Sequence, residues 1–315
     1  MARTLCMLLH ANGLCKDVWT PFAQSLARLL RVDAQTQKHR RPEVLSWRLG
    51  DVQLVSVDLK GHGHAPALLE TQLEAEDWMA YAHQVEEILE EFLSEMPQAP
   101  EEVFGIGHSL GGGTLLLSQA LGRQSRFSKL FIFEPMYLFV EEKLCKLVGQ
   151  GLEMMHSLRL VNPLVAKTLR RRSVWATRQE ACEDLSKKEF FAAWDSAARQ
   201  GYFEGGLIGD SPTRLACDPQ TEAAVFSSGV PVTLLEVLRK PDGLRHCSLY
   251  VAIGQRDTLW NLPVAEEIFS RLEPSTKISV VDGSHMWPVE SPAAFAAKVA
   301  DSFGWDVGKV PSSRL

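Results

Sequence analysis

Short, almost continuously apolar runs recur along this chain. They cover residues 4–9, 52–57, 103–107, 129–133, 248–253 and 277–281. Such runs are typical of strands that are covered on both faces, as in a parallel sheet. Between the second and third runs, apolar side chains recur at helical spacing, with glutamates on the opposite side. The apolar residues are Trp78, Tyr81, Val85, Ile88, Leu89 and Phe92. The alternation predicts an α/β fold with a mostly parallel central sheet and helices on both faces.

The alternation stops after residue 133 and resumes near residue 248. The patterns in between are helical, over 137–148, 162–171, 178–185 and 188–199. We interpret this block as a helical cap inserted between two strands of the sheet. The chain then divides into a first half of the core (1–134), the cap (135–226), a second half of the core (227–306) and a tail (307–315). The polar segment 33–50 is predicted to be a surface loop.

Composition narrows the class of protein. The chain has 315 residues and a net charge of −6, which argues against a nucleic-acid partner because phosphate binding needs a basic face. We interpret the two basic stretches, 38–41 and 170–172, as solvated helix ends or loops. No apolar run approaches the ~20 residues that span a bilayer, so no transmembrane segment is expected. The six cysteines are scattered without a C-x-x-C pair, which favours reduced thiols and an intracellular protein.

One glycine-rich turn carries the strongest chemical signal. The segment Gly107-His108-Ser109-Leu110-Gly111 has the form G-x-S-x-G and stands between an apolar run and a helical run. In such a strand-to-helix turn the serine hydroxyl is lifted out of the sheet, and the helix N-terminus is directed at a developing oxyanion. We predict that Ser109 is a nucleophile and that the Leu110 N–H is one oxyanion donor.

A dinucleotide-binding turn is the rival interpretation. Gly105-Ile106-Gly107 matches the first half of G-x-G-x-x-G, and Glu134 ends the next predicted strand, where an acid that binds ribose can stand. Leu110 takes the place of the third glycine, which weakens this interpretation.

A nucleophilic hydroxyl needs a base, and the base needs an acid that orients it. Asp257 and His285 each follow a predicted strand, so both are expected at the carboxyl edge of the sheet. The order Ser109, Asp257, His285 is the order expected with this type of turn. Glu134 is the alternative acid, because it follows the strand after the nucleophile helix.

A histidine pair raises the question of a metal. His62 and His64 form H-x-H, but no further ligand follows at the spacing of a zinc site. We therefore predict a structural turn and no metal site.

Three further segments resemble those of α/β-hydrolases. His10-Ala11-Asn12-Gly13 resembles the loop that supplies the second oxyanion donor, with alanine in place of the usual glycine. The segment 58–63 resembles the Asp-x-Arg-Gly-x-Gly turn, with Lys60 in place of arginine, and 283–290 resembles the histidine loop. The resemblance to α/β-hydrolase superfamily serine hydrolases covers the whole chain except the cap. Weaker signals, in the His-Ala-Asn-Gly loop, 133–135 and 215–223, resemble the subgroup of fungal peroxisomal lipases and related bacterial hydrolases.

The resemblance implies an α/β-hydrolase fold and a second oxyanion donor at the N–H of Asn12, with Ala11 left open. It implies cleavage of a carboxylic ester with an apolar acyl group, through an acyl-enzyme and without a cofactor. Two alternatives stay open: a hydrolase of C–C bonds with the same triad, and a small-molecule receptor or scaffold of this fold with little turnover.

The end of the chain suggests an address. Ser313-Arg314-Leu315 is a conservative variant of the Ser-Lys-Leu peroxisomal signal. We expect the peroxisomal import receptor as a partner and a peroxisomal location; without import the protein would be cytoplasmic.

Overall fold

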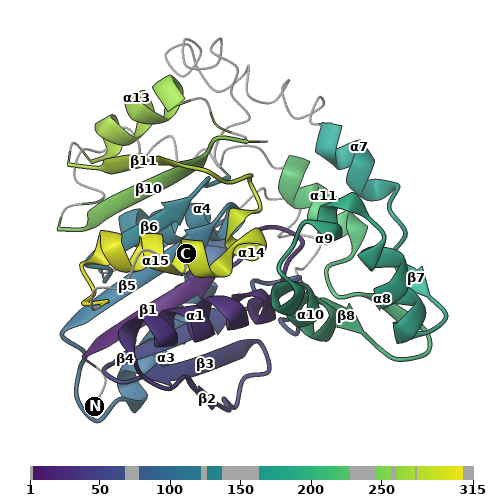
Figure 1. Ribbon diagram of the computed structural model, residues 1–315, viewed down its shortest axis with the longest axis horizontal. Helices are drawn as coiled ribbons and strands as arrows, with labels where there is room; N and C mark the ends of the chain where they lie inside the picture. The colour runs from purple at the N-terminus through teal and green to yellow at the C-terminus, as the bar shows by residue number, and fades with distance from the viewer. Residues whose placement is uncertain are drawn as a thin grey trace.

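The apolar runs come together in one central sheet (Figure 1). We describe a computed structural model, which covers residues 3–67, 78–121, 126–136, 163–227, 244, 246–256, 260, 262–273 and 275–307. Within these residues, eight strands form the sheet in the order β11-β10-β6-β5-β1-β4-β3-β2. They are β1 Thr4–Leu9, β2 Gln35–Gln37, β3 Val44–Leu49, β4 Val52–Val57, β5 Glu102–His108, β6 Lys129–Phe133, β10 Ser248–Gly254 and β11 Lys277–Val281. β3 pairs antiparallel with β2 and β4, and the other pairs are parallel. The predicted α/β fold is confirmed.

Helices on both faces of the sheet create two hydrophobic cores. The helices are η1 Lys16–Trp19, α1 Thr20–Leu30, α3 Met79–Glu95, α4 Leu110–Leu121, α13 Leu262–Leu272, α14 Trp287–Glu290 and α15 Pro292–Phe303. β1 explains why its run is continuously apolar. Cys6 and Leu8 belong to the core with α1 and α15, whereas Leu5, Met7 and Leu9 belong to the core with α3 and α4.

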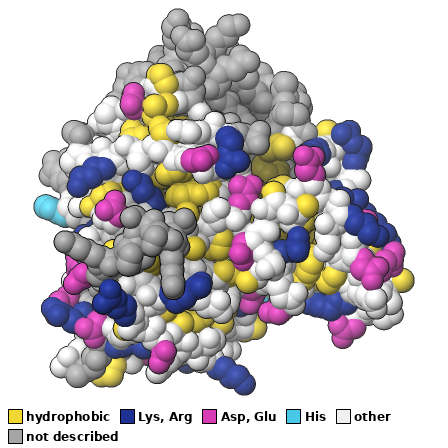
Figure 2. All heavy atoms as spheres, in the orientation of Figure 1, with side chains coloured by type: hydrophobic (Ala, Val, Ile, Leu, Met, Phe, Trp, Pro, Cys, Tyr) yellow, Lys and Arg dark blue, Asp and Glu magenta, His cyan; other side chains and the backbone are white. Residues whose placement is uncertain are grey.

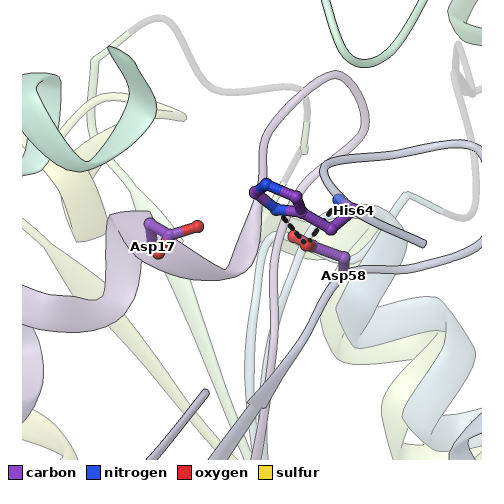
Figure 3. Close-up of side chains that lie close together, drawn as sticks. All are labelled: Asp17, Asp58 and His64. Carbon is purple, nitrogen blue, oxygen red and sulfur yellow. Dashed lines mark hydrogen bonds and ion pairs between the residues drawn. The ribbon is translucent and has the colours of Figure 1, made fainter. Parts of the chain in front are cut away.

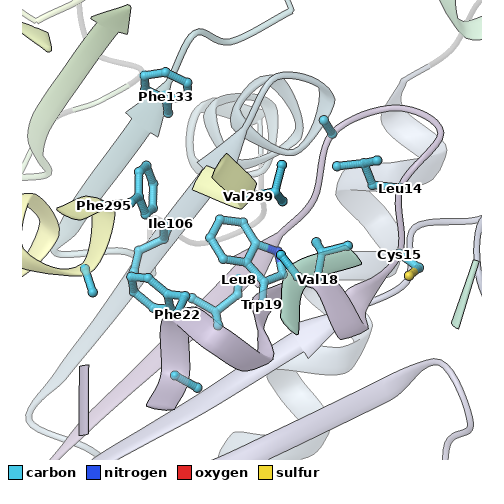
Figure 4. Close-up of a cluster of buried hydrophobic side chains, with 14 of the residues drawn as sticks. Leu8, Leu14, Cys15, Val18, Trp19, Phe22, Ile106, Phe133, Val289 and Phe295 are labelled. Atoms are coloured by element: carbon cyan, nitrogen blue, oxygen red, sulfur yellow. The ribbon is translucent and has the colours of Figure 1, made fainter. Parts of the chain in front are cut away.

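Aromatic rings fill the first core and fix the end of β6 (Figure 4). Trp19, Phe22 and Phe295 contact one another, with ring centroids between 5.5 and 5.9 Å apart. Phe133, the last residue of β6, packs edge-on against the Phe295 ring at 5.9 Å. Because Phe133 directly precedes Glu134, this packing holds the strand end on which part of the candidate site stands.

The prediction of a surface loop over 33–50 is wrong at two strands, the short and exposed β2 and the longer β3. Val44–Leu49 forms β3, in which Trp47 and Leu49 are buried. Gly50-Asp51 closes a hairpin between β3 and β4, and Gly-Asp between two strand-like runs is a hairpin signal. The polar residues within β3 interrupt its apolar pattern, which is why the strand was not predicted.

The described residues 163–227, which we call the cap, lie to one side of the sheet in Figure 1. Their elements are α7 Pro163–Leu169, β7 Val174–Trp175, α8 Arg178–Ser186, α9 Glu189–Ala192, α10 Ser196–Gly205, β8 Leu207–Ile208, β9 Thr213–Leu215 and α11 Pro219–Ser227. The single helix expected over 188–199 is two helices, because the Asp195 carboxylate accepts the N–H groups of Ala197 and Ala198 and starts α10. Within the described residues the cap also holds a small antiparallel sheet, β7-β9-β8, that was not predicted from the sequence. The helix predicted over 137–148 lies outside the described residues.

The surface mixes charges of both signs. On the face shown in Figure 2, basic side chains are interspersed with acidic ones, so this face offers no broad basic stripe for phosphates. In the stretch 38–41, Arg40 and Arg41 donate to Glu91 at 2.7 and 2.6 Å. The interpretation of 170–172 as solvated is wrong for Arg171, which forms an ion pair with the buried Glu222. None of the helices in the described part of the chain is long and apolar enough to cross a membrane.

Candidate functional site

The turn between β5 and α4 holds Ser109 in a strained backbone conformation. Its φ is +52°, a value that non-glycine residues rarely adopt and that costs of order 1–3 kcal/mol. The Ser109 N–H donates to the carbonyl of Phe133 at 3.0 Å, and the N–H of Met136 donates to the Ser109 carbonyl at 2.9 Å. The strain is therefore maintained by bonds to the end of the neighbouring strand, β6. Such a turn presents a serine at the carboxyl edge of the sheet.

A histidine and a glutamate meet beside this turn. His285, in the loop after β11, has its Nδ1 2.7 Å from Oε2 of Glu134, directly after β6. The Glu134 side chain is fully buried and that of His285 is 19% exposed. A carboxylate at Nδ1 fixes the tautomer in which Nδ1 carries the proton and Nε2 is free to accept one. The pair thus has the arrangement of a general base and its orienting acid.

The last residue of β10 makes room for the Glu134 carboxylate. The Gly254 N–H donates to Glu134 Oε1 at 2.8 Å. A Cβ atom at Gly254 would lie 2.5 Å from the carbonyl oxygen of Gly283, so no larger residue fits there. Glu134 itself has φ +39°, which makes it a second non-glycine residue in the left-handed region. Both carboxylate oxygens are therefore used, one to hold the acid and one to hold His285.

The other predicted acid, Asp257, lies outside the described residues. Glu134 is the one of the two predicted acids for which the structure describes a contact with His285. The strand order explains how it reaches the histidine. Glu134 stands at the end of β6, and β6 is separated from β11 by β10 alone. The loop that carries His285 spans the end of β10 to reach the glutamate.

The loop after β1, residues 10–13, lies beside the serine turn, and we call it the oxyanion loop. The Gly111 N–H donates to the carbonyl of His10 at 3.1 Å, which ties this loop to the start of α4. The His10 Nε2 accepts the Leu59 N–H at 3.1 Å, so this histidine orients the loop. In the described part of the chain, the backbone N–H groups of Asn12 and Leu110 donate no hydrogen bond. An oxyanion hole requires N–H groups that are free to donate, and these two are the donors expected from the sequence.

Comparison with known proteins places this geometry in a family. Residues 6–298 match a family model described as the alpha/beta hydrolase family. The chain belongs to that family. This membership decides against the rival prediction of a dinucleotide-binding fold. No curated protein matches the sequence.

Solved structures share the fold of this α/β-hydrolase. The peroxisomal alpha-beta-hydrolase Lpx1 from Saccharomyces cerevisiae has a TM-score of 0.71 and 17% identity, covering 100% of this chain and 81% of its own. E-2-(Acetamidomethylene)succinate hydrolase has a TM-score of 0.65 and 13% identity, covering 96% and 92%. The esterase EaEST from Exiguobacterium antarcticum has a TM-score of 0.56 and 15% identity, covering 95% and 91%. At these identities the likeness shows the fold alone.

A second histidine, His108, holds the loop that carries His285. The His108 Nε2–H donates to the backbone carbonyl of His285 at 2.8 Å, and the two rings lie 5.0 Å apart between centroids. Burial, together with the nearby His285, lowers the pKa of His108 well below its usual range, so its ring is neutral and has one N–H to donate. His108 is next to Ser109 in the sequence, so a local bond would need no distant partner. The bond instead crosses 177 residues of chain to hold the loop of His285.

His64, the second histidine of the H-x-H pair, is part of a salt-bridge cluster (Figure 3). Asp17, Asp58 and His64 place oxygen and nitrogen atoms within 4.8 Å of one another, a spacing that suits a cation. The Lys16 Nζ already lies among them, 2.9 Å from Asp58, 3.3 Å from Asp17 and 3.1 Å from His64. Burial alone disfavours the charged amine, but Asp58 and Asp17 outweigh it and raise the pKa of Lys16. The cation of this cluster is therefore a lysine, a residue that no sequence motif had singled out.

Proposed function

We propose that this α/β-hydrolase is a serine hydrolase of carboxylic esters, with Ser109 as nucleophile, His285 as base and Glu134 as orienting acid. The observation that carries the proposal is the 2.7 Å bond from His285 Nδ1 to the buried Glu134, beside a serine at φ +52°. Burying the Glu134 carboxylate and straining the Ser109 backbone both cost free energy of folding, and a catalytic triad gives a reason for both. Asp257, the acid first predicted, is replaced in this proposal by Glu134.

The proposed reaction follows from these groups. His285 Nε2 takes the proton of the Ser109 hydroxyl as its oxygen attacks the carbonyl carbon of the ester. The N–H groups of Leu110 and Asn12 donate to the oxyanion that forms, while Glu134 stabilises the charged imidazole. His285 then returns the proton to the departing alcohol. Water, activated by the same histidine, hydrolyses the acyl-enzyme and frees Ser109.

An apolar acyl group is the substrate class that we propose. An esterase among the similar structures supports the ester bond. The cap supports the apolar group, because aromatic side chains such as Phe191, Trp194 and Tyr202 give it a buried apolar interior facing the core. We also propose a peroxisomal location, which the similarity to a peroxisomal hydrolase supports.

Covalent labelling tests the nucleophile and base directly. A fluorophosphonate mimics the tetrahedral transition state and reacts efficiently with activated serines only. We expect intact mass to show one label per chain, peptide mapping to place it on Ser109, and labelling to be lost in His285→Ala. Hydrolysis of p-nitrophenyl esters should fall to background in Ser109→Ala. A folded wild type that is neither labelled nor active would contradict the proposal and favour a receptor.

A further inference from the structure

The end of the cap makes direct contact with the oxyanion loop. The Asn12 side-chain Nδ2 donates to the backbone carbonyl of Glu222, the fourth residue of α11, at 3.0 Å. The Glu222 carboxylate occupies the space beside Gly13: a Cβ there would lie 2.8 Å from Glu222 Oε1. Glu222 of the cap therefore contacts both residues at the end of the oxyanion loop.

The same asparagine is held from the other side by the core. The His62 Nε2–H donates to Asn12 Oδ1 at 3.0 Å, and the His62 Nδ1 lies 3.0 Å from the carbonyl of Lys60. His62 is fully buried and Asn12 is 9% exposed, so neither side chain has room to change partners without loss. The Asn12 amide is thus a bridge between the cap and the turn after β4.

The Glu222 side chain anchors its end of the bridge. Its carboxylate is almost buried and faces Arg171 Nη2 at 2.6 Å, in an ion pair without the alignment of a hydrogen bond. Arg171 follows α7, so α7 and α11, which pack against each other, share this contact. The position of the Glu222 carbonyl, and with it the bond to Asn12, depends on how the cap is docked.

We propose that Asn12 is a positioning residue whose side chain couples cap docking to the oxyanion hole. The inference rests on the proposed function, in which the Asn12 N–H is an oxyanion donor. Its side-chain bonds to Glu222 and His62 set the place of that N–H. An oxyanion donor must lie within a few tenths of an ångström of its position, and losing one costs about 10²–10³ in kcat. The cap then helps to assemble the catalytic site as well as to enclose the substrate.

The coupling links two segments that resemble the same subgroup of hydrolases in the sequence. One is the His-Ala-Asn-Gly loop and the other is residues 215–223. The structure brings these two segments together, although 210 residues separate Asn12 from Glu222. Their chemistry is complementary: an amide that donates, a carbonyl that accepts, and a glycine that leaves space for a carboxylate.

Asn12→Ala tests the coupling by removing both side-chain bonds while leaving the backbone N–H in place. With p-nitrophenyl butyrate we expect kcat to fall about 10- to 100-fold and KM to stay within about 3-fold, because the lost interaction acts in the transition state. The affinity for a boronic acid that forms a tetrahedral adduct with Ser109 should fall by a similar factor. Gln119→Ala is the control. Gln119 is another buried amide, near the end of α4, whose oxygen accepts the Phe127 N–H. It should lower stability without changing kcat.

Amide hydrogen exchange gives a readout that does not depend on turnover. In Asn12→Ala, exchange should quicken in peptides that cover 10–14 and 217–222, and both should keep their wild-type rates in Gln119→Ala. A rise in KM with unchanged kcat would show a mere lid contact and overturn the proposal. Unchanged exchange in both segments would also overturn it, even if the wild type proved inactive. Inactivity of the wild type, by itself, would count against the proposed function.

Discussion

Two non-glycine residues with positive φ stand side by side at the carboxyl edge of the sheet. Ser109 has φ +52° and Glu134 has φ +39°, and they follow β5 and β6, which are neighbours. Strain of this kind costs of order 1–3 kcal/mol per residue and persists only where surrounding contacts impose it. Here the Ser109 N–H bonds to Phe133 and the Glu134 N–H bonds to Ala252 at 3.1 Å. The strained residues are the ones to which the proposed chemistry assigns nucleophile and acid.

The identity of the acid can be tested by a matched pair of variants. Glu134→Gln keeps the shape of the side chain but cannot stabilise a charged His285, so we expect kcat to fall by about 10³- to 10⁴-fold. Asp257→Asn should lower kcat by less than about 10-fold, since the large loss is confined to the acid that bonds the Nδ1 of the catalytic histidine. Steady-state kinetics on one ester, with active sites counted by fluorophosphonate labelling, measures both. A larger loss in Asp257→Asn would return the role to Asp257.

At the scale of elements, α7 and α11 are joined by a pair of charges with unequal burial. The Glu222 side chain is 9% exposed and that of Arg171 is 32% exposed. Burial raises the pKa of Glu222, and the attraction of Arg171 only partly offsets this. A buried carboxylate with one charged partner is weak support for stability, because desolvation can cancel the attraction. The pair is better explained by the place in which it holds the Glu222 backbone.

The raised pKa of Glu222 predicts a definite pH dependence of stability. A group with a raised folded-state pKa contributes its stability fully below the unfolded value of 4.5, and this contribution is lost as pH rises through the folded value. Glu222→Gln should therefore gain stability relative to wild type as pH rises above 4.5, and Arg171→Ala should make the decline steeper. Denaturant unfolding at several pH values, from the unfolded value of 4.5 up to about 8, measures the difference. A difference in unfolding free energy between wild type and Glu222→Gln that does not change with pH would refute the raised pKa of Glu222.

At the scale of the whole molecule, the sheet separates two cores and presents its carboxyl edge to the cap. The Ser109 turn, the loop of His285 and the oxyanion loop all stand at that edge, where parallel strands bring distant segments together. The cap docks over this edge through η1 and the oxyanion loop, with α10 packed against η1. In the proposed mechanism, the site therefore depends on core and cap alike.

The proposed peroxisomal targeting signal is tested with the whole chain. We expect a fluorescent protein fused to the N-terminus of the chain to gather in peroxisomes, because the signal is read at a free C-terminus. Deleting Ser313-Arg314-Leu315 should leave the fusion in the cytosol, and replacing Arg314 with Lys should keep it in peroxisomes. Colocalisation with a peroxisomal marker measures this. Unchanged puncta after the deletion would refute the role of the tripeptide.

Local patterns determined much of this protein from its sequence. The run of β1 is apolar throughout because each face of the strand meets a core, and the glycine-rich turn around Ser109 is written in five consecutive residues. Strand β3 and the break before α10 were missed, although Gly50-Asp51 and Asp195 are recognisable turn and cap signals. In both places the hydrophobic pattern is typical of a different structure, because polar residues interrupt β3 and helical spacing continues through Asp195.

Only the tertiary structure decided which distant groups meet. The sequence left Asp257 and Glu134 both open, because the bond to His285 depends on the position of strand ends across the sheet. The bonds of His108 to the loop of His285 and of Asn12 to the cap join segments 177 and 210 residues apart, and neither has a local signature. Periodicity reports the burial of each residue within its own element. The partner of a buried polar group is set by how the elements pack, and packing is a property of the folded chain.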